Sequence, residues 1–312
     1  MTGVSDTFED ELRAYLVGAG FNEMLAISLQ DEGLTALSGD TPVRVLNPVS
    51  VDMQALRTNL VAGALPIVQR NRYQGAKNLR LFEIGSVYSL SEGKDAHLLE
   101  AYREESRLLL LMSGDYLPIG YGVAQRKCDF PDLKGEAEAL LSKFCLDKYG
   151  LIYYDTHNTL TEHAINVEIN GTYAGFLGTI KKEVLERFDI EDRVYVCELS
   201  VAAIQTARRS ERKLIPLPKF PTVSRDLAFV VDVETPQLKV QEAIRRSGGG
   251  LLKKVTLFDV YVGAQFGSGK KSVAYALEFQ ADDRTLTDGE IDRVVFAVVQ
   301  DVQRECNAVL RS

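Results

Sequence analysis

Histidine and cysteine are both scarce in this sequence, and their scarcity argues against several kinds of site. Only three histidines occur, His97, His157 and His163, so no histidine-rich metal centre is expected. The four cysteines lie far apart and form no C-x-x-C pair, which argues against a zinc ribbon or a disulfide framework. Cysteines spaced in this way suit a reducing, cytoplasmic compartment.

The sequence also lacks any apolar run that approaches the ~20 residues needed to cross a membrane. Its first residues are polar and acidic, so neither a signal peptide nor a membrane partner is expected. The composition, 46% hydrophobic and 26% charged, is typical of globular proteins, and 312 residues suffice for one large domain or two.

Negative charge exceeds positive charge, but unevenly along the chain. The formal net charge of −8 argues against a nucleic-acid partner for the chain as a whole. From Pro218 onward, however, basic and acidic residues are equal in number, so the excess lies in the preceding part. A basic run that includes Arg208, Arg209, Arg212 and Lys213 leads into the balanced part. A solvated linker and a segment that follows a phosphate backbone are both compatible with this run.

Hydrophobic periodicity in the first two thirds of the chain predicts an α+β layer structure. Apolar residues at helical spacing predict helices over residues 8–19, 56–70 and 133–145, the first capped by Asp6 or Thr7. Extended patterns predict strands over 23–29, 79–90, 106–112, 164–169, 172–179 and 193–199. Asn170-Gly171 predicts a two-residue hairpin turn. Because helices and strands do not alternate regularly, the sheet is expected to be largely antiparallel.

The segment "LIPLPKFP" predicts a domain boundary, because three prolines disrupt regular structure. It divides the chain into residues 1–212 and 218–312. In the second part, strands are predicted at 225–232, 252–261, 272–280 and near 308–310. One helix is expected from Thr235-Pro236 to Gly248, and another begins with the capping box Thr287-x-x-Glu290. This order is the ferredoxin-like β-α-β-β-α-β arrangement.

Alternation along these strands separates two faces of the second predicted sheet. The large apolar residues, Phe258 and Val260 among them, are expected to face the helices. The other face then carries small residues, with Asp259, Tyr261 and Ser272 near one edge. A flat floor beside a tyrosine leaves room for a planar base, which proteins read by stacking and hydrogen bonds. An ordinary solvent-exposed face fits the same pattern, so the pattern alone leaves both interpretations open.

Several separated stretches resemble the beta subunit of bacterial phenylalanyl-tRNA synthetase. The stretches "LNPVSVDMQALRTNLVAGALPIVQRN", "LRLFEIGSVY" and "CDFPDLKGEAEALL" resemble its synthetase-like module. The stretches "FPTVSRDLAFVVD", "LFDVYVG", "KKSVAYALEFQ", "RTLTDGEI" and "AVLR" resemble its ferredoxin-fold anticodon-binding domain. The matches run in order over nearly the whole chain. Because the family's beta subunit is much longer, the sequence is expected to be its C-terminal portion.

The resemblance implies a class II synthetase-like antiparallel sheet with flanking helices, followed by the anticodon-binding domain. It implies two partners, an alpha subunit and tRNA(Phe), in a cytoplasmic heterotetramer that joins phenylalanine to its tRNA at the expense of ATP. It also implies that Asp259, Tyr261 and Ser272 contact the first anticodon base. Nearby basic residues are candidates for contacts with the flanking phosphates: Lys253, Lys270, Lys271 and Arg311.

No catalytic residue is expected in this chain. Class II synthetases bind ATP through a strand in which an arginine stands two residues before a glutamate, because a planar guanidinium pairs well with phosphate. Here Leu81 stands two residues before Glu83, and Arg80 points to the other face of the strand. The Gly-rich third class II motif is also missing from the first domain. We therefore expect no cofactor in this chain; ATP and magnesium are implied for the whole enzyme.

Two other functions compete with a tRNA-binding scaffold. One is a class II ligase that acts alone, against which Leu81 counts. The other is a small-molecule regulatory module of the β-α-β-β-α-β type, for which only the glycines at 267–269 offer a ligand loop. In the scaffold interpretation, the helices predicted near 8–19 and 56–70 are expected to form the partner surface. Arg57 is assigned to packing or to that interface.

Overall fold

The computed structural model describes residues 7–91, 101–145, 149–152, 159–208, 218–263 and 266–311. The chain divides into two compact units, Met1–Arg212 and Lys213–Ser312, and each unit has its own hydrophobic core. Within the described ranges, no helix is long and apolar enough to span a membrane.

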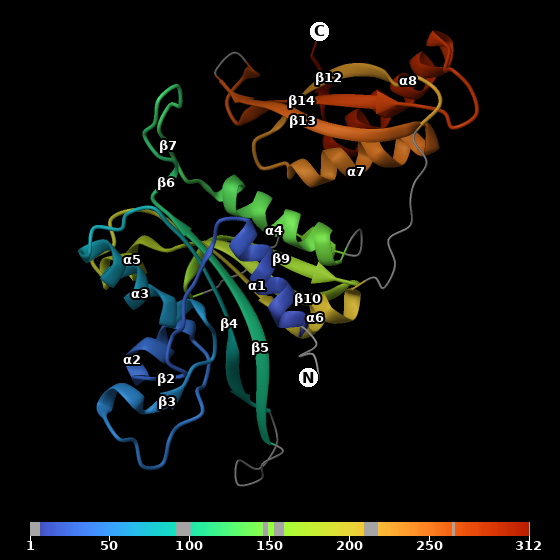
Figure 1. Cartoon of the computed structure of the whole chain (residues 1–312). Helices are drawn as coiled ribbons and strands as arrows, with labels where there is room; N and C mark the ends of the chain where they lie inside the picture. Colours follow the sequence, from blue (N-terminus) through green and yellow to red (C-terminus); the bar gives the residue numbers. More distant parts are fainter. Residues whose placement is uncertain are drawn as a thin grey trace. The chain divides into compact units, whose positions relative to one another are not determined.

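The first unit is built on a seven-stranded sheet with the order β1-β4-β5-β11-β10-β9-β8 (Figure 1). Strand β1 runs parallel to β4, and every other neighbouring pair is antiparallel. The strands are β1 (Asn22–Glu23), β4 (Leu79–Leu90), β5 (Tyr102–Ser113), β8 (Tyr149–Ile152), β9 (Thr161–Ile169), β10 (Thr172–Ile180) and β11 (Val194–Ser200). Two short pairs lie outside this sheet: β2 (Leu29–Gln30) with β3 (Ala55–Leu56), and β6 (Asp115–Leu117) with β7 (Arg126–Lys127).

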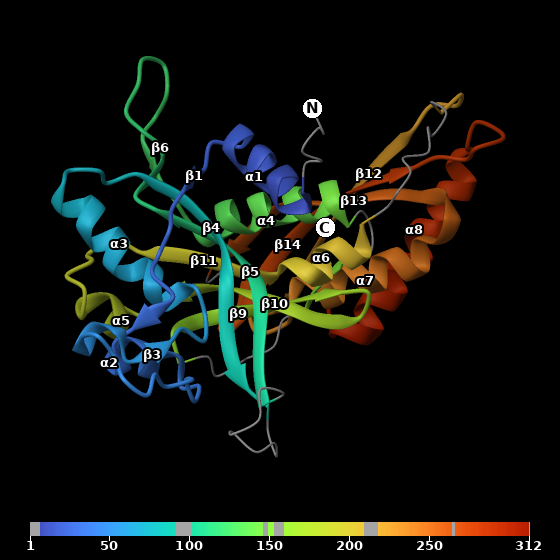
Figure 2. The same ribbon diagram turned by 60° about the horizontal axis from the view of Figure 1, so that its bottom comes forward.

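Helices cover both faces of this sheet (Figure 2). One face packs against α1 (Phe8–Gly18), α4 (Phe130–Phe144) and α6 (Val201–Ala207). The other packs against α2 (Glu32–Thr35), α3 (Val61–Tyr73) and α5 (Lys182–Glu186). In β5, Leu108 and Leu110 enter the first core, whereas Leu109 and Leu111 enter the second. The continuous apolar run predicted as a strand is therefore buried on both sides.

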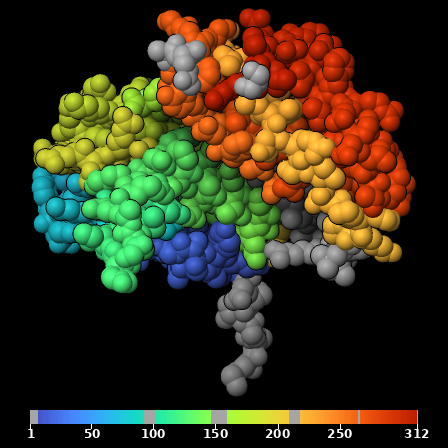
Figure 3. Space-filling view, turned by 90° about the horizontal axis from the view of Figure 1, so that it is seen from above, coloured from blue at the N-terminus to red at the C-terminus, as the bar shows by residue number. Residues whose placement is uncertain are grey.

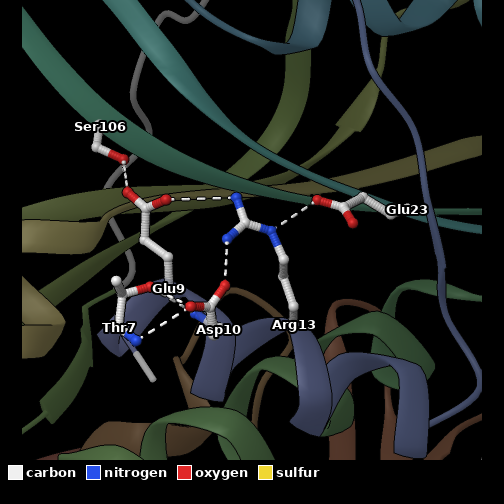
Figure 4. A network of polar contacts seen from close by, with 6 residues as sticks. All are labelled: Thr7, Glu9, Asp10, Arg13, Glu23 and Ser106. Atoms are coloured by element: carbon white, nitrogen blue, oxygen red, sulfur yellow. Dashed lines mark hydrogen bonds and ion pairs between the residues drawn. The ribbon is translucent and has the colours of Figure 1, made fainter. Parts of the chain in front are cut away.

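Helix α1 is fixed to the sheet by polar contacts at its first turns (Figure 4). Thr7 caps the helix, because its hydroxyl accepts from the backbone of Asp10 at 3.3 Å while its own N–H donates to the Asp10 carboxylate at 3.0 Å. Arg13 pairs with Asp10 and reaches Glu23 of β1 at 2.9 Å. Glu9 accepts a hydrogen bond from a serine hydroxyl of β5 at 3.1 Å. Of the two predicted caps, Thr7 is the one the structure supports.

The elements predicted for the first unit are mostly confirmed, with one clear exception. Strand β4 has the predicted bounds, and Asn170 and Gly171 both have positive φ, 55° and 74°, as the two-residue turn requires. The single strand predicted over 23–29 is wrong, since β1 and β2 are two short strands. Between them the backbone of Ala26 is held by the side chains of Arg57 and Glu83 instead of by a strand neighbour.

The second unit has a four-stranded antiparallel sheet with the order β13-β14-β12-β15. Its strands are β12 (Val223–Asp232), β13 (Leu252–Val262), β14 (Lys270–Phe279) and β15 (Val309–Leu310). The helices α7 (Gln237–Gly248) and α8 (Asp288–Cys306) share one core with the strands. The β-α-β-β-α-β prediction is thus confirmed, and the chain as a whole is α+β.

A β-bulge in edge strand β13 overturns one prediction for this sheet. The ladder to β14 skips from Leu257 to Asp259, so Phe258 is an additional residue. Val260 is paired with the buried Val273, but it lies near the end of an edge strand. Phe258 and Val260 are both exposed and belong to no core cluster, so the prediction that they pack against the helices is wrong.

The register of the first sheet can be tested at a glycine that has no room for a side chain. Gly175 in β10 has φ +151°, and a Cβ there would lie 1.9 Å from the carbonyl oxygen of Glu198 in β11. We expect Gly175→Ala to destabilise the first unit by roughly 3 kcal/mol or more, since backbone strain and overpacking each cost about 1–3 kcal/mol.

Gly135 in α4 provides the matched control, because a Cβ there would meet nothing within 4 Å. Gly135→Ala should stabilise the same unit by about 0.5–1 kcal/mol, since alanine loses less conformational freedom in a helix. Urea unfolding followed by circular dichroism measures both variants. A Gly175→Ala protein as stable as the wild type would contradict the β10–β11 register.

Candidate nucleic-acid interface

The sheet face of the second unit that points away from its helices carries two rows of paired residues. In one row, Asp259 of β13 pairs with Ala274 of β14, which pairs with Ala228 of β12. In the next row, Tyr261 pairs with Ser272. Alternation along β13 and β14 places both rows on the same face. The structure therefore brings the three predicted base-contacting residues together on one face.

Part of this face is covered by two further side chains. The backbone N–H of Arg311 donates to the carbonyl of Ala228 at 2.8 Å, which places this residue beside the alanine row. Its guanidinium carbon lies 5.2 Å from the ring centroid of Phe266, and its Nη1 lies 3.5 Å from the Ser272 hydroxyl. The Phe266 ring meets Tyr261 edge to face, with centroids 5.9 Å apart.

Because Arg311 and Phe266 cover part of the face, the three predicted base-contacting residues differ in their exposure to solvent. Tyr261 is 49% exposed and Asp259 is exposed, whereas Ser272 is only 3% exposed. The alternation along the strand predicted the correct face for Ser272, but it did not predict that the Arg311 side chain lies over it. Phe266 was overlooked because it stands between glycines in a loop, where no strand periodicity points to it. Its isolation as the one aromatic residue between β13 and β14 was the available signal.

Of the candidate phosphate contacts, two lie near this face. Arg311 is described above, and Lys270 alternates with Ser272 onto the same face, where it pairs with Asp232 at 2.6 Å. Both cations thus flank the row that contains Tyr261.

The other two candidates are placed elsewhere. Lys271 belongs to the opposite face, where its Nζ donates to the carbonyl of Val233 at 2.8 Å and burial lowers its pKa. Lys253 lies roughly 25 Å from Tyr261 at about 3.3 Å per residue of strand, and it pairs with Asp282 at 3.1 Å. In the basic run of 208–213, only Arg208 falls within the described residues.

Strand β4 matches the strand that binds ATP in class II synthetases, but in this chain hydrophobic core residues pack against it. Leu81 is buried with Leu65, Leu109 and Leu111 on the α3 side of the sheet. Arg80 lies on the other face, where it pairs with Glu136 of α4. In the described part of the first unit, Arg57 and Arg80 at this strand are both held in ion pairs with protein carboxylates, so these residues do not fit a phosphate of ATP.

Glu83 of the same strand forms a buried ion pair with Arg57. Arg57 Nη1 lies 2.6 Å from Glu83 Oε1, and Arg57 Nε donates to the carbonyl of Ser86 at 2.8 Å. The two residues are 3% and 1% exposed. Burial raises the pKa of Glu83, and the Arg57 guanidinium opposes that shift. A Cβ on Gly85 would lie 2.2 Å from Arg57 Nη2, so the glycine of "EIG" leaves room for this guanidinium.

The described residues also contain no cluster of three or more His, Cys, Asp or Glu that could hold a metal ion. His97 and His157 lie outside the described residues, and His163 is exposed in β9. All four cysteines are buried, and none of them is in a disulfide.

The partner surface predicted on helices α1 and α3 stays a prediction: most apolar residues of both helices enter the cores of the first unit, but Val17 and Tyr73 are exposed. Further exposed apolar side chains lie on two segments joined by backbone hydrogen bonds, such as Gln54 N to Gln30 O at 3.0 Å. We call these residues the apolar loop surface: Leu25, Ile27, Leu46, Val49 and Val51.

A second exposed apolar segment is the β6–β7 hairpin, which projects from the first unit in Figure 1 and lies at the surface in Figure 3. Its tip carries the exposed Ile119 and Tyr121.

Comparisons with known proteins agree with this architecture. The family model described as "Phenylalanyl tRNA synthetase beta chain CLM domain" matches residues 4–201, and the model "Ferredoxin-fold anticodon binding domain" matches residues 218–311. The chain is thus related to aminoacyl-tRNA synthetases and carries an anticodon-binding type of domain. It belongs to the family of phenylalanyl-tRNA synthetase beta chains.

Curated relatives support the same assignment. The phenylalanine–tRNA ligase beta subunit of Salinibacter ruber is 34% identical over 98% of this chain and 39% of its own length. That of Symbiobacterium thermophilum is 35% identical over 96% of this chain and 34% of its own length. The chain thus spans less than two fifths of these relatives. Among solved structures, the pyrrolysyl-tRNA synthetase of Desulfitobacterium hafniense superposes with a TM-score of 0.48 at 17% identity, over 63% of this chain and 66% of that one.

The buried ion pair generates a stability prediction. Arg57→Met leaves the Glu83 carboxylate buried without its counter-charge, so we expect a loss of about 3–5 kcal/mol at pH 7. Without Arg57, the pKa of Glu83 in the folded chain stays above its unfolded value, so the loss should shrink as the pH falls and Glu83 is protonated in both states.

Arg208→Met is the control, since Arg208 pairs with Glu11 at 2.8 Å at the surface. It should cost at most about 1 kcal/mol, because exposed ion pairs contribute little. Urea titrations at pH 5 and pH 7 measure both variants. If both variants lose the same free energy of unfolding at pH 7, burial of the Arg57–Glu83 pair adds nothing to its contribution to stability.

Proposed function

We propose that this chain is the part of a phenylalanine–tRNA ligase beta subunit that binds the tRNA(Phe) anticodon and scaffolds the catalytic alpha subunit. The observation that carries the proposal is the shared face of Asp259, Tyr261 and Ser272 in a domain of the anticodon-binding family. A regulatory module of the same topology is not favoured, since both family matches are to synthetase components.

The chemistry of this face suits a guanine at the first anticodon position. Tyr261 is half exposed, so its ring can stack on a base. The Asp259 carboxylate accepts hydrogen bonds and cannot donate them when ionised, which suits the N–H groups on the pairing edge of guanine. Ser272 can contribute only after Arg311 moves aside, because the guanidinium covers its hydroxyl. Arg311 and Lys270 are then near enough to meet the flanking phosphates.

The apolar loop surface is the proposed contact for the alpha subunit. Leu46 and Val49 are 97% and 93% exposed, although an isolated chain gains nothing from presenting such residues together. Permanent interfaces are rich in apolar residues, and the name beta subunit of the relatives implies a second kind of chain. We extend the proposal to the heterotetramer and to a cytoplasmic location, which suits four cysteines that form no disulfide.

Phenylalanine activation is assigned to the partner and not to this chain. In the described part of the first unit, the ATP strand is occupied by Leu81 and by the Arg57–Glu83 pair. ATP and magnesium therefore belong to the remainder of the enzyme in this proposal.

The assignment of activation can be checked directly. We expect this chain, free of alpha subunit, to catalyse no phenylalanine-dependent exchange of pyrophosphate into ATP, because no arginine stands at the position of Leu81. The assembled enzyme serves as the positive control. Exchange by the purified chain clearly above a no-enzyme blank would overturn the assignment.

Tyr261→Ala tests whether the face of Asp259, Tyr261 and Ser272 binds the anticodon. Loss of one base stack costs about 1–3 kcal/mol, which corresponds to roughly 5- to 150-fold weaker binding. We expect this loss when tRNA(Phe) is titrated against the assembled enzyme. Val260→Ala is the matched control, because Val260 is a comparably exposed neighbour on the other face. Unchanged affinity in Tyr261→Ala would mean that this face does not stack on the anticodon.

Leu46→Asp tests the partner surface. Because a carboxylate would have to be desolvated in an apolar interface, we expect at least tenfold weaker binding of purified alpha subunit in a pull-down titration. Tyr121→Asp, at the tip of the β6–β7 hairpin, carries the same charge into another exposed apolar segment and should leave binding within twofold. The opposite ranking of the two variants would move the interface to the hairpin.

A further inference from the structure

The polar contacts of Arg57 and Glu83 converge on the peptide groups of one residue, Ala26. Arg57 Nη1 donates to the Ala26 carbonyl at 3.3 Å, and Glu83 Oε1 accepts from the Ala26 N–H at 3.4 Å. Two residues earlier, the backbone of Met24 still donates to Phe82 of β4 at 2.8 Å. The chain therefore leaves the sheet after Met24 and is held again, two residues on, by the ion pair.

The residues on either side of Ala26 are Leu25 and Ile27, which are 81% and 64% exposed. The Arg57 backbone N–H also donates to the carbonyl of Ser28 at 2.9 Å. One ion pair thus fixes the backbone from which two residues of the apolar loop surface project.

Stability alone does not account for this arrangement. Removing two charges from water costs about as much as their attraction returns, and well-packed apolar replacements of buried ion pairs are often equally stable. An apolar pair could fill the same space, but it could not satisfy both backbone groups of Ala26. What the ion pair adds is a fixed backbone geometry beneath exposed apolar side chains.

We propose that Arg57 and Glu83 are positioning residues that preorganise the apolar loop surface for the alpha subunit. This inference rests on the proposed function. A surface held in its bound geometry loses less conformational freedom on association and so binds more tightly. Glu83 of β4 thereby helps to shape an interface.

The experiment compares four forms of the full chain, the wild type and three variants. The double variant Arg57→Met/Glu83→Gln removes both charges and the hydrogen bond to the Ala26 carbonyl. The control Arg80→Met/Glu136→Gln removes an ion pair on the opposite face of β4, far from Ala26 in the hydrogen-bond network. Each form is measured for thermal unfolding, for amide hydrogen exchange at residues 25–28, and for affinity to purified alpha subunit.

For the double variant we expect a folded protein, at least tenfold faster exchange at residues 25–28, and at least tenfold weaker binding of alpha subunit. The control should stay within twofold of the wild type in both exchange and binding. Arg57→Lys keeps the charge but lacks the fork that reaches Ala26 and Ser86 together, so it should show the same changes with less effect on folding.

Binding within twofold of the wild type, in either folded variant, would overturn the inference. If Leu46→Asp weakens binding while these variants do not, the apolar loop surface binds the alpha subunit, but the ion pair does not preorganise it. If the wild-type chain does not bind alpha subunit at all, both the proposed partner and this inference are wrong.

Discussion

The two-residue alternation of β13 and β14 is the constraint on which the second unit depends. It sends Val273, Tyr275 and Leu277 into the core beneath the helices and leaves Ser272 and Ala274 on the other face. The bulge at Phe258 shifts the phase of β13 by one residue, so that Asp259 and Tyr261 share the face of Ser272. Without that additional residue, the register of the following residues would shift by one, and Asp259 and Tyr261 would lie on the opposite face from Ser272.

In the first unit, hydrophobic residues and one buried ion pair occupy the face of β4 that carries Leu81 and Glu83. Leucines of β4, β5 and α3 fill the space over the strand, and the remaining Glu83 is neutralised by Arg57. The same arrangement pins the chain at Ala26 and projects apolar side chains outward. One buried ion pair thus connects β4 with the backbone that carries the exposed side chains of Leu25 and Ile27.

Sequence reasoning predicted elements whose periodicity is carried by local residues. The β-α-β-β-α-β order, β4 and the turn at Asn170 were all predictable, because alternation and turn chemistry are local properties. The interruption after β1 was not predictable, since Ala26 is held by residues far along the chain. The exposure of Phe258 and the burial of Ser272 also depend on tertiary contacts, a bulge and the Arg311 side chain, that no local pattern records.

In the proposed function, the face of Asp259, Tyr261 and Ser272 reads the first anticodon base. Its most direct test is the discrimination between tRNA(Phe) and the same tRNA with its first anticodon guanine replaced by cytosine, measured for the assembled enzyme with wild-type Asp259 and with Asp259→Asn. We predict that the wild type prefers guanine by roughly 5- to 150-fold, as about 1–3 kcal/mol of base discrimination implies, and that Asp259→Asn loses most of this preference. An identical preference in the two proteins would contradict the account.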